Sequence, residues 1–299
     1  MDHINEFLEY LIAEKGYSQQ TVITYRTAIS DFVNFVAALD EDLDWNSIDV
    51  DIIRRWIAQR RENGTDARTV KKQLSALRTM YRYLMIMGIT DKNPARLVTN
   101  PKVAKRLPTF LKQSEMDRLF DDTEFDDNFE GHRDHLILLT FYSTGIRVSE
   151  LTGLNTSSLS LSGNEMKVLG KRNKERIVPF GEEMHNALKA YITERSKLSR
   201  IGNEEALFID KRGFRLTVPK IRNIVKKHLT LVTNQKKRTP HTLRHTFATV
   251  MLNNGADIRA VQELLGHESL EATEVYTHLS FADMRKEYEK AHPREQHGS

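Results

Sequence analysis

The sequence contains no cysteine among its 299 residues. This absence excludes disulfide bonds, thiolate zinc sites, iron–sulfur clusters and cysteine nucleophiles. Glycine and proline are few, at 14 and 7 residues, so the chain is neither collagen-like nor of low complexity. No uninterrupted apolar run approaches the roughly 20 residues of a membrane-spanning helix, and the start of the chain lacks the pattern of a signal peptide. We expect a soluble, cytoplasmic globular protein with no membrane partner.

The charge balance is also nearly even. Lys and Arg number 45 against 41 Asp and Glu, which gives a net charge of +4 and a weak indication of a polyanionic partner. Hydrophobic residues make up 39% of the chain, enough to bury real cores. The length favours two domains of ordinary size.

The first hundred residues predict four helices, because apolar residues recur at three- and four-residue spacing between recognisable starts and stops. Gly16 ends the first helix, and Ser18, Asp49 and Asp66 are expected to begin the next three. The fourth helix, from about Asp66 to Met87, carries a second stripe with several cations and no acid. The stripe consists of Arg68, Lys71, Lys72, Ser75, Arg78 and Arg82. Such a face can bind phosphates along a groove, and the alternative is an ordinary solvated surface.

The remainder predicts a basic linker and a second, mixed domain. Three prolines lie between residues 91 and 110, where helical periodicity lapses, and Lys102, Lys105 and Arg106 make this stretch basic. Ser114 is expected to cap a short helix, and 132–143 to form a buried one. Three short strand-like runs follow and predict a small antiparallel meander: 159–161, 166–169 and 176–178. Five further helices and a helical tail are expected: 182–198, 217–232, 241–254, 257–265, 270–278 and a segment from Ala282.

These patterns together predict a mainly α protein of two domains. Residues 1–92 would form an N-terminal four-helix domain and residues 93–110 a basic linker. Residues 111–299 would form a C-terminal α+β domain that contains the meander.

Two segments combine residue types that could carry chemistry. His241 and Arg244 are three residues apart on an expected helix, so both side chains can face one point. His245 lies about 100° further round than Arg244 and is expected to pack or hydrogen-bond internally. Upstream, Arg147 follows a glycine that would stop a helix, and Glu150, three residues on, could hold it in a salt bridge.

His241 and His245 also have the spacing of a zinc-binding pair. The glutamate that a H-E-x-x-H metalloprotease needs after the first histidine is Thr242 here, and no third ligand is indicated. We therefore expect no metal site and no cofactor.

These segments resemble the tyrosine recombinase (phage integrase) family, and the whole chain is similar to its Xer-type members. The resemblance covers essentially residues 1–290. Its motifs contain Arg147, Lys171, the His241-x-x-Arg244 pair, His267 in L-G-H and Tyr276 nine residues later. It implies a helical core-binding (SAM-like) domain and a catalytic domain that clamp DNA from opposite sides.

The resemblance implies a role for each motif residue. Tyr276 would be the nucleophile, and the guanidinium groups of Arg147 and Arg244 would stabilise charge on the phosphate. His241 and His267 would add hydrogen bonds or proton transfers. Lys171, on the hairpin of the meander, would be the general acid for the leaving 5′ oxygen. The reaction would form a 3′-phosphotyrosyl bond and need neither metal nor ATP.

The resemblance also implies partners. Double-stranded DNA with a specific recombination site would bind to a homo-tetramer, or to a hetero-tetramer formed with a paralogue, in the nucleoid. The segment after Ser280 would dock on a neighbouring protomer. The expected phosphate contacts are Arg68, Lys71, Lys72, Arg78, Arg222, Lys236 and Lys237.

Three alternative functions share much of this pattern. An integrase or transposase of a mobile element would use the same chemistry. A type IB topoisomerase-like enzyme would relax supercoils without synapsis. Outside enzymes, a DNA-binding accessory protein with a vestigial site remains open, and the complete residue set argues against it.

Overall fold

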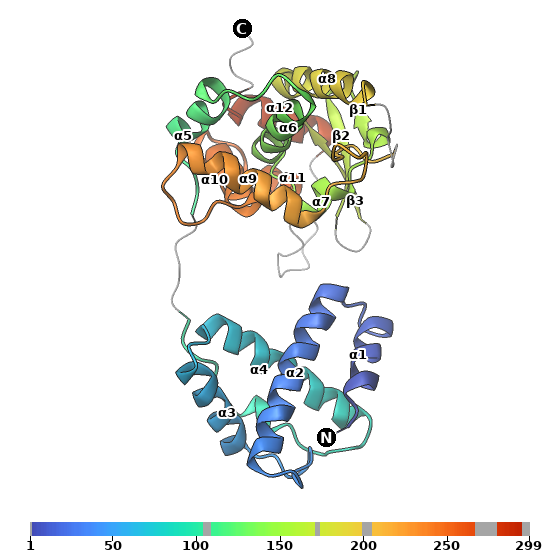
Figure 1. Ribbon diagram of the computed structural model, residues 1–299, viewed down its shortest axis with the longest axis vertical. Helices are drawn as coiled ribbons and strands as arrows, with labels where there is room; N and C mark the ends of the chain where they lie inside the picture. The colour runs from blue at the N-terminus through green and yellow to red at the C-terminus, as the bar shows by residue number, and fades with distance from the viewer. Residues whose placement is uncertain (1, 104–108, 171–173, 199–204, 267–279, 295–299) are drawn as a thin grey trace. The chain divides into compact units, whose positions relative to one another are not determined.

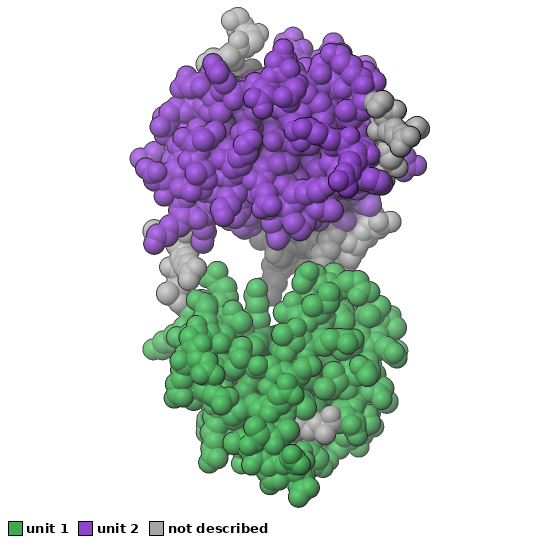
Figure 2. Space-filling model, viewed as in Figure 1, with its two compact units in different colours: residues 1–106 green, residues 107–299 purple. Residues whose placement is uncertain are grey.

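The computed structural model describes residues 2–103, 109–170, 174–198, 205–266 and 280–294. The chain divides into two compact units, residues 1–106 (unit 1) and 107–299 (unit 2), which Figure 2 shows in green and purple. Within the described ranges, no helix is both long enough and apolar enough to cross a membrane.

The described residues of unit 1 form four α-helices and a short 3-10 helix. Their bounds are α1 (Ile4–Ala13), α2 (Gln19–Leu39), α3 (Val50–Glu62), α4 (Ala67–Ile86) and η1 (Pro94–Arg96). Ser18, Asp49 and Asp66 each accept a hydrogen bond from a backbone N–H of the first turn that follows, so the three expected helix starts are confirmed. The core between the helices contains large aromatic side chains, among them Phe32 and Trp56, whose rings meet edge to face.

The segment after α4 folds back onto unit 1. Ala95 and Val98 are part of its buried core, although both lie in the stretch that the sequence predicts as linker. The Arg78 side chain donates to the carbonyls of Ala95 (2.9 Å) and Val98 (2.6 Å) and to Asn100 Oδ1 (3.0 Å). Arg78 therefore differs from its neighbours on the basic stripe, because its guanidinium binds the chain itself.

Unit 2 combines helices with one small sheet (Figure 1). The elements before and within the sheet are α5 (Gln113–Asp117), η2 (Arg118–Asp122), α6 (Phe129–Thr144), α7 (Val148–Gly153), η3 (Thr156–Ser158), β1 (Leu159–Ser160), β2 (Glu165–Leu169) and β3 (Glu175–Pro179). The helices after it are α8 (Glu182–Ser196), α9 (Val218–Val232), α10 (Pro240–Asn253), α11 (Ile258–Leu265) and α12 (Phe281–Ala291).

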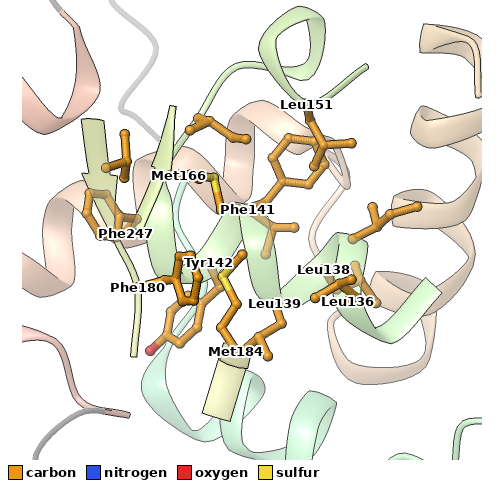
Figure 3. Packing of buried hydrophobic residues seen from close by; sticks show 14 of the residues in the cluster. Leu136, Leu138, Leu139, Phe141, Tyr142, Leu151, Met166, Phe180, Met184 and Phe247 are labelled. Carbon is orange, nitrogen blue, oxygen red and sulfur yellow. The ribbon is translucent and has the colours of Figure 1, made fainter. Parts of the chain in front are cut away.

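Helix α6 forms the centre of unit 2 and packs against α8, α9 and α10. Figure 3 shows its apolar side chains among residues of β2, α8 and α10, including Met166, Met184 and Phe247. The run 136–139 is fully buried on every side, which explains why this helix has a continuous apolar run instead of a one-sided stripe.

The sheet has the predicted order β1-β2-β3, and both pairs are antiparallel. Met166 pairs with Val178, and both side chains are fully buried against the core. The Gly170 N–H donates to the Lys174 carbonyl at 2.8 Å beyond the end of β2. This bond continues the β2–β3 pairing past the end of the two strands.

The C-terminal helix α12 packs against α10, α11 and β3 of its own chain. Tyr288 is buried, and His292, just after the helix, is fully buried beside the rings of Tyr142 and Tyr288. In this chain α12 packs within its own unit, and the docking on a neighbouring protomer that the resemblance implies stays a prediction.

The α5 start corrects one expectation. Ser114 does not cap this helix, because the N-cap position is Lys112, whose N–H donates to Glu115 Oε2 at 2.8 Å. The expected helix 270–278 lies outside the described residues.

Candidate active site

Arg147 lies at the junction between α6 and α7. Helix α6 ends at Gly145 in the left-handed conformation (φ 61°), and a Cβ there would lie 2.5 Å from a carbon of the Phe247 ring. Arg147 then occupies the N-cap position of α7, where its N–H donates to Glu150 Oε2 at 2.7 Å. Its guanidinium binds Glu150 Oε1 at 2.8 Å, so the expected pair is confirmed. The side chain keeps 38% of its surface exposed, enough to reach a ligand.

Arg244 comes from the second turn of α10 and is almost entirely buried. Its two terminal nitrogens donate to the carbonyls of Gly145 (2.6 Å) and Leu265 (2.7 Å), which are the end of α6 and the end of α11. Burial lowers the pKa of Arg244 to about 10, and the nearby charge of Arg147 adds to this shift. The group is still protonated at neutral pH, and it lies close enough to Arg147 for their charges to interact.

Glu150 balances part of this positive charge. Burial alone would raise its pKa, but the hydrogen bonds from Arg176 and from Arg147, together with their charges, lower it to about 2. Arg176 on β3 holds both carboxylate oxygens, at 3.0 and 2.8 Å. The sequence did not single out Arg176 as a site residue.

A signal for Arg176 was present in the strand pattern. Residues two apart on a strand share a face, so Arg176 shares the face of the buried Val178. An arginine on an inward-facing position requires a partner of opposite charge. That partner, Glu150, lies 26 residues away in the chain, and so periodicity alone could not identify it.

The C-terminal end of α11 gathers the three arginines. Three consecutive carbonyls, those of Leu264, Leu265 and Gly266, accept hydrogen bonds from Arg176, Arg244 and Arg147 respectively. Gly266 caps the helix in the left-handed conformation, with φ 62°. Segments that are far apart in the sequence therefore meet at one helix end, and cations replace the missing hydrogen-bond donors there.

His241 lies one turn before Arg244 on α10 and is exposed. Its ring contacts that of His245 edge to face, with centroids 4.3 Å apart. Partial desolvation of the ring lowers the pKa of His241, and the neighbouring His245, Arg244 and Lys237 lower it further, so the neutral form is favoured at pH 7. Within the described ranges, no third acidic or histidine side chain joins the pair to form a metal-binding group.

Three of the expected residues, Lys171, His267 and Tyr276, lie outside the described residues. Lys171 follows Gly170 directly in the sequence, and His267 follows Gly266. The described part of the site therefore contains Arg147, Glu150, Arg176, His241 and Arg244.

The basic residues expected to contact DNA fall into two groups. Most are exposed, namely Arg68, Lys71 and Lys72 on α4, Arg222 on α9, and Lys236 and Lys237 before α10. Arg78 is half-buried and engaged with unit 1, as described above.

Comparison with known proteins supports these observations. The model of the phage integrase family matches residues 109–283, and that of the phage integrase N-terminal SAM-like domain matches residues 4–88. The tyrosine recombinase XerC of Thermodesulfovibrio yellowstonii is 40% identical over 297 residues, covering 97% of this chain and 96% of the relative. The XerC of Bacillus subtilis is 38% identical over 291 residues, covering 96% and 95%.

Solved structures show the same fold. The XerH site-specific recombinase bound to palindromic difH substrate, in a post-cleavage complex, is similar with a TM-score of 0.72 at 20% identity, covering 98% of this chain and 83% of that one. The Tn1549 transposon integrase in complex with circular intermediate DNA has a TM-score of 0.69 at 19% identity, covering 95% and 98%.

Proposed function

Because the chain belongs to the phage integrase family and is an XerC-like tyrosine recombinase, we propose that it cuts and rejoins duplex DNA through a covalent 3′-phosphotyrosyl intermediate. The observation that supports this most is the shared anchoring of Arg147 and Arg244. Both bind adjacent carbonyls at the end of α11, so that two guanidinium groups from distant segments face one region. Planar forks of this kind match the non-bridging oxygens of a phosphate.

The nucleophile is Tyr276. Its phenolic oxygen forms a bond to phosphorus while the bond from phosphorus to the 5′ oxygen breaks. The phenol has an ordinary pKa of about 10, so its proton must be removed as it attacks. His241, whose neutral form is favoured at pH 7, is able to accept that proton, and His267 supplies a further hydrogen bond.

Lys171 protonates the leaving 5′ oxygen. The product bond stores the energy of the bond that was cut, so a 5′ hydroxyl from a second strand can attack the phosphotyrosine and expel the tyrosine without ATP. Arg147 and Arg244 supply the positive charge that metal ions supply in two-metal nucleases, and the proposed reaction therefore needs no divalent cation.

The substrate is double-stranded DNA that carries a specific recombination site. XerH and the Tn1549 integrase were solved in complex with DNA, and the exposed cations of α4, α9 and the segment before α10 provide phosphate contacts in this chain. Exchange between two sites requires four active centres, and we propose a homo-tetramer, or a hetero-tetramer with a paralogue, acting on the nucleoid in the cytoplasm.

A nicked suicide duplex tests the proposal. The protein is incubated with EDTA and duplexes from its own genomic neighbourhood, in which the nick lets the 5′ fragment diffuse away and traps the adduct. We expect a covalent complex that maps to Tyr276 at a DNA 3′ end. A requirement for metal, or a 5′ linkage, would contradict the proposal.

A further inference from the structure

Arg176 lies on β3, beside the site, and each of its three guanidinium nitrogens donates to the protein. Its Nε donates to the Leu264 carbonyl at 3.0 Å, and its two terminal nitrogens form a bidentate pair with Glu150. The side chain is 16% exposed, against 38% for Arg147. Arg176 is therefore placed to act through Glu150 and not on a bound phosphate.

Two glycines enclose the guanidinium of Arg176. A Cβ at Gly266 would lie 3.0 Å from one of its terminal nitrogens, and a Cβ at Gly170 would lie 3.5 Å from the same nitrogen. Gly170 directly precedes Lys171, and Gly266 directly precedes His267. The contact at Gly170 is of ordinary van der Waals length, whereas at Gly266 an added Cβ would crowd the Arg176 guanidinium, so the position of Arg176 depends on a glycine at 266.

The charges around Glu150 indicate what a second arginine contributes to the charge of the site. The guanidinium groups of Arg147 and Arg176 both donate to Glu150, and the shortest of these bonds is 2.8 Å for each. If Arg147 were the sole partner of this buried carboxylate, the two charges would cancel and little of the Arg147 charge would act on a phosphate. With Arg176 paired to Glu150, Arg147 and Arg244 leave a net positive charge of two.

We propose that Arg176 is a positioning residue that neutralises Glu150 and thereby leaves the fork of Arg147 available to the scissile phosphate. This inference rests on the proposed function. It assigns to Arg176 an effect on the rate of strand cleavage and not on the affinity for DNA.

The variant Arg176→Met removes the charge and keeps most of the apolar stem. In single-turnover cleavage of the suicide duplex at saturating protein, we expect a rate about 100-fold below that of the unaltered protein. The equilibrium affinity for the same duplex should change by less than about threefold. Arg215→Met is the matched control, because Arg215 also binds backbone carbonyls, those of Thr152 and Leu154, but has no contact with Glu150. It should slow cleavage less than about tenfold.

The double variant Arg176→Met with Glu150→Gln decides between charge balance and a simple structural role. It removes the uncompensated carboxylate together with its partner, so it also remains testable if Arg176→Met alone fails to fold. We expect cleavage at least about tenfold faster than in the single Arg176→Met variant. A double variant no faster than the single variant, or a single variant with unaltered cleavage, would overturn the inference. Failure of the unaltered protein to form any adduct would instead reject the proposed function itself.

Discussion

The Glu150 carboxylate joins the start of α7 to β3, because it binds both Arg147 and Arg176. It is 6% exposed and receives donors from the backbone and side chain of Arg147 and from Arg176. A buried carboxylate with these donors is held in its ionised form, as its pKa of about 2 indicates. Its loss should therefore lower the free energy of unfolding.

The substitution Glu150→Gln should make the free energy of unfolding less dependent on pH. The pKa of Glu150 is lowered from 4.5 to about 2 in the folded protein, so its contribution is present above about pH 4.5 and is lost as the pH falls towards 2. The shift corresponds to about 3 kcal/mol at neutral pH. Urea denaturation measures the free energy of unfolding of both proteins. At pH 7 we expect the variant to be less stable than the unaltered protein by up to that amount, and we expect the difference to shrink below pH 4.

Glu175→Gln is the matched control for this measurement. Glu175 lies on β3 next to Arg176 and pairs with Lys167 at 3.3 Å, but both side chains of this pair are more than half exposed. Its removal should change stability by less than about 1 kcal/mol at any pH. Equal effects of the two substitutions would contradict the role assigned to the Glu150 pair.

At the scale of elements, the end of α11 is the meeting point of α6, α7, α10 and β3. The carbonyls of 264–266 receive donors from arginines on α10, on β3 and at the start of α7. The left-handed cap at Gly266 brings this helix end within reach of all three. The position of this helix end is therefore fixed by side chains from the rest of unit 2.

Gly266→Ala tests this arrangement against a control with the same backbone strain. Gly266 has φ 62° and Gly255 has φ 81°, so alanine is strained at both, by about 1 kcal/mol. Around Gly255 there is nothing within 4 Å of an added Cβ, whereas at Gly266 the Cβ would meet the Arg176 guanidinium at 3.0 Å. We expect Gly266→Ala to lower the free energy of unfolding by at least about 2 kcal/mol. Thermal unfolding of the two variants measures the difference, and equal losses would contradict it.

Local signals made most elements predictable from the sequence. Ser18, Asp49 and Asp66 cap their helices through neighbouring N–H groups, which is why the residue type alone indicated the starts. The predicted start of α5 was wrong, because the cap is a hydrogen bond from the Lys112 N–H to the Glu115 carboxylate and does not involve Ser114. The partnership of Arg176 with Glu150 and Leu264 could not be predicted, because it joins positions 26 and 88 residues apart that no local pattern relates.

At the scale of the whole molecule, the exposed cations and the anchored ones should contribute differently to DNA binding. Lys71 and Lys72 on α4 are exposed, while Arg78 on the same helix holds the carbonyls of Ala95 and Val98. Cations bound to phosphates release counterions, so each contributes to the salt dependence of affinity. A cation bound to the chain itself does not.

Salt titrations of DNA affinity separate these roles. Replacing Lys71 and Lys72 together by alanine should reduce the slope of log affinity against log salt by about 2, since each phosphate contact contributes about 0.9. Arg78→Met should leave the slope within about 0.5 and lower the thermal stability of unit 1 instead. A slope that falls equally in both variants would show that Arg78 binds phosphate.

The sequence also predicted the family and both units, because five short motifs occur in a fixed order along the chain. It placed Arg147 and Arg244 in one site although they are 97 positions apart in the numbering, and the hydrogen bonds of both to the end of α11 agree with that placement. The roles of Lys171, His267 and Tyr276 remain predictions from the resemblance.

Strand exchange by Tyr276→Phe tests the central claim most directly. The substitution removes one oxygen atom, the proposed nucleophile, and keeps the ring. In a two-site exchange assay with EDTA, we expect no recombinant product and no covalent adduct, with DNA affinity unchanged and both activities present in the unaltered protein. Recombinant product formed by Tyr276→Phe at the rate of the unaltered protein would contradict the account.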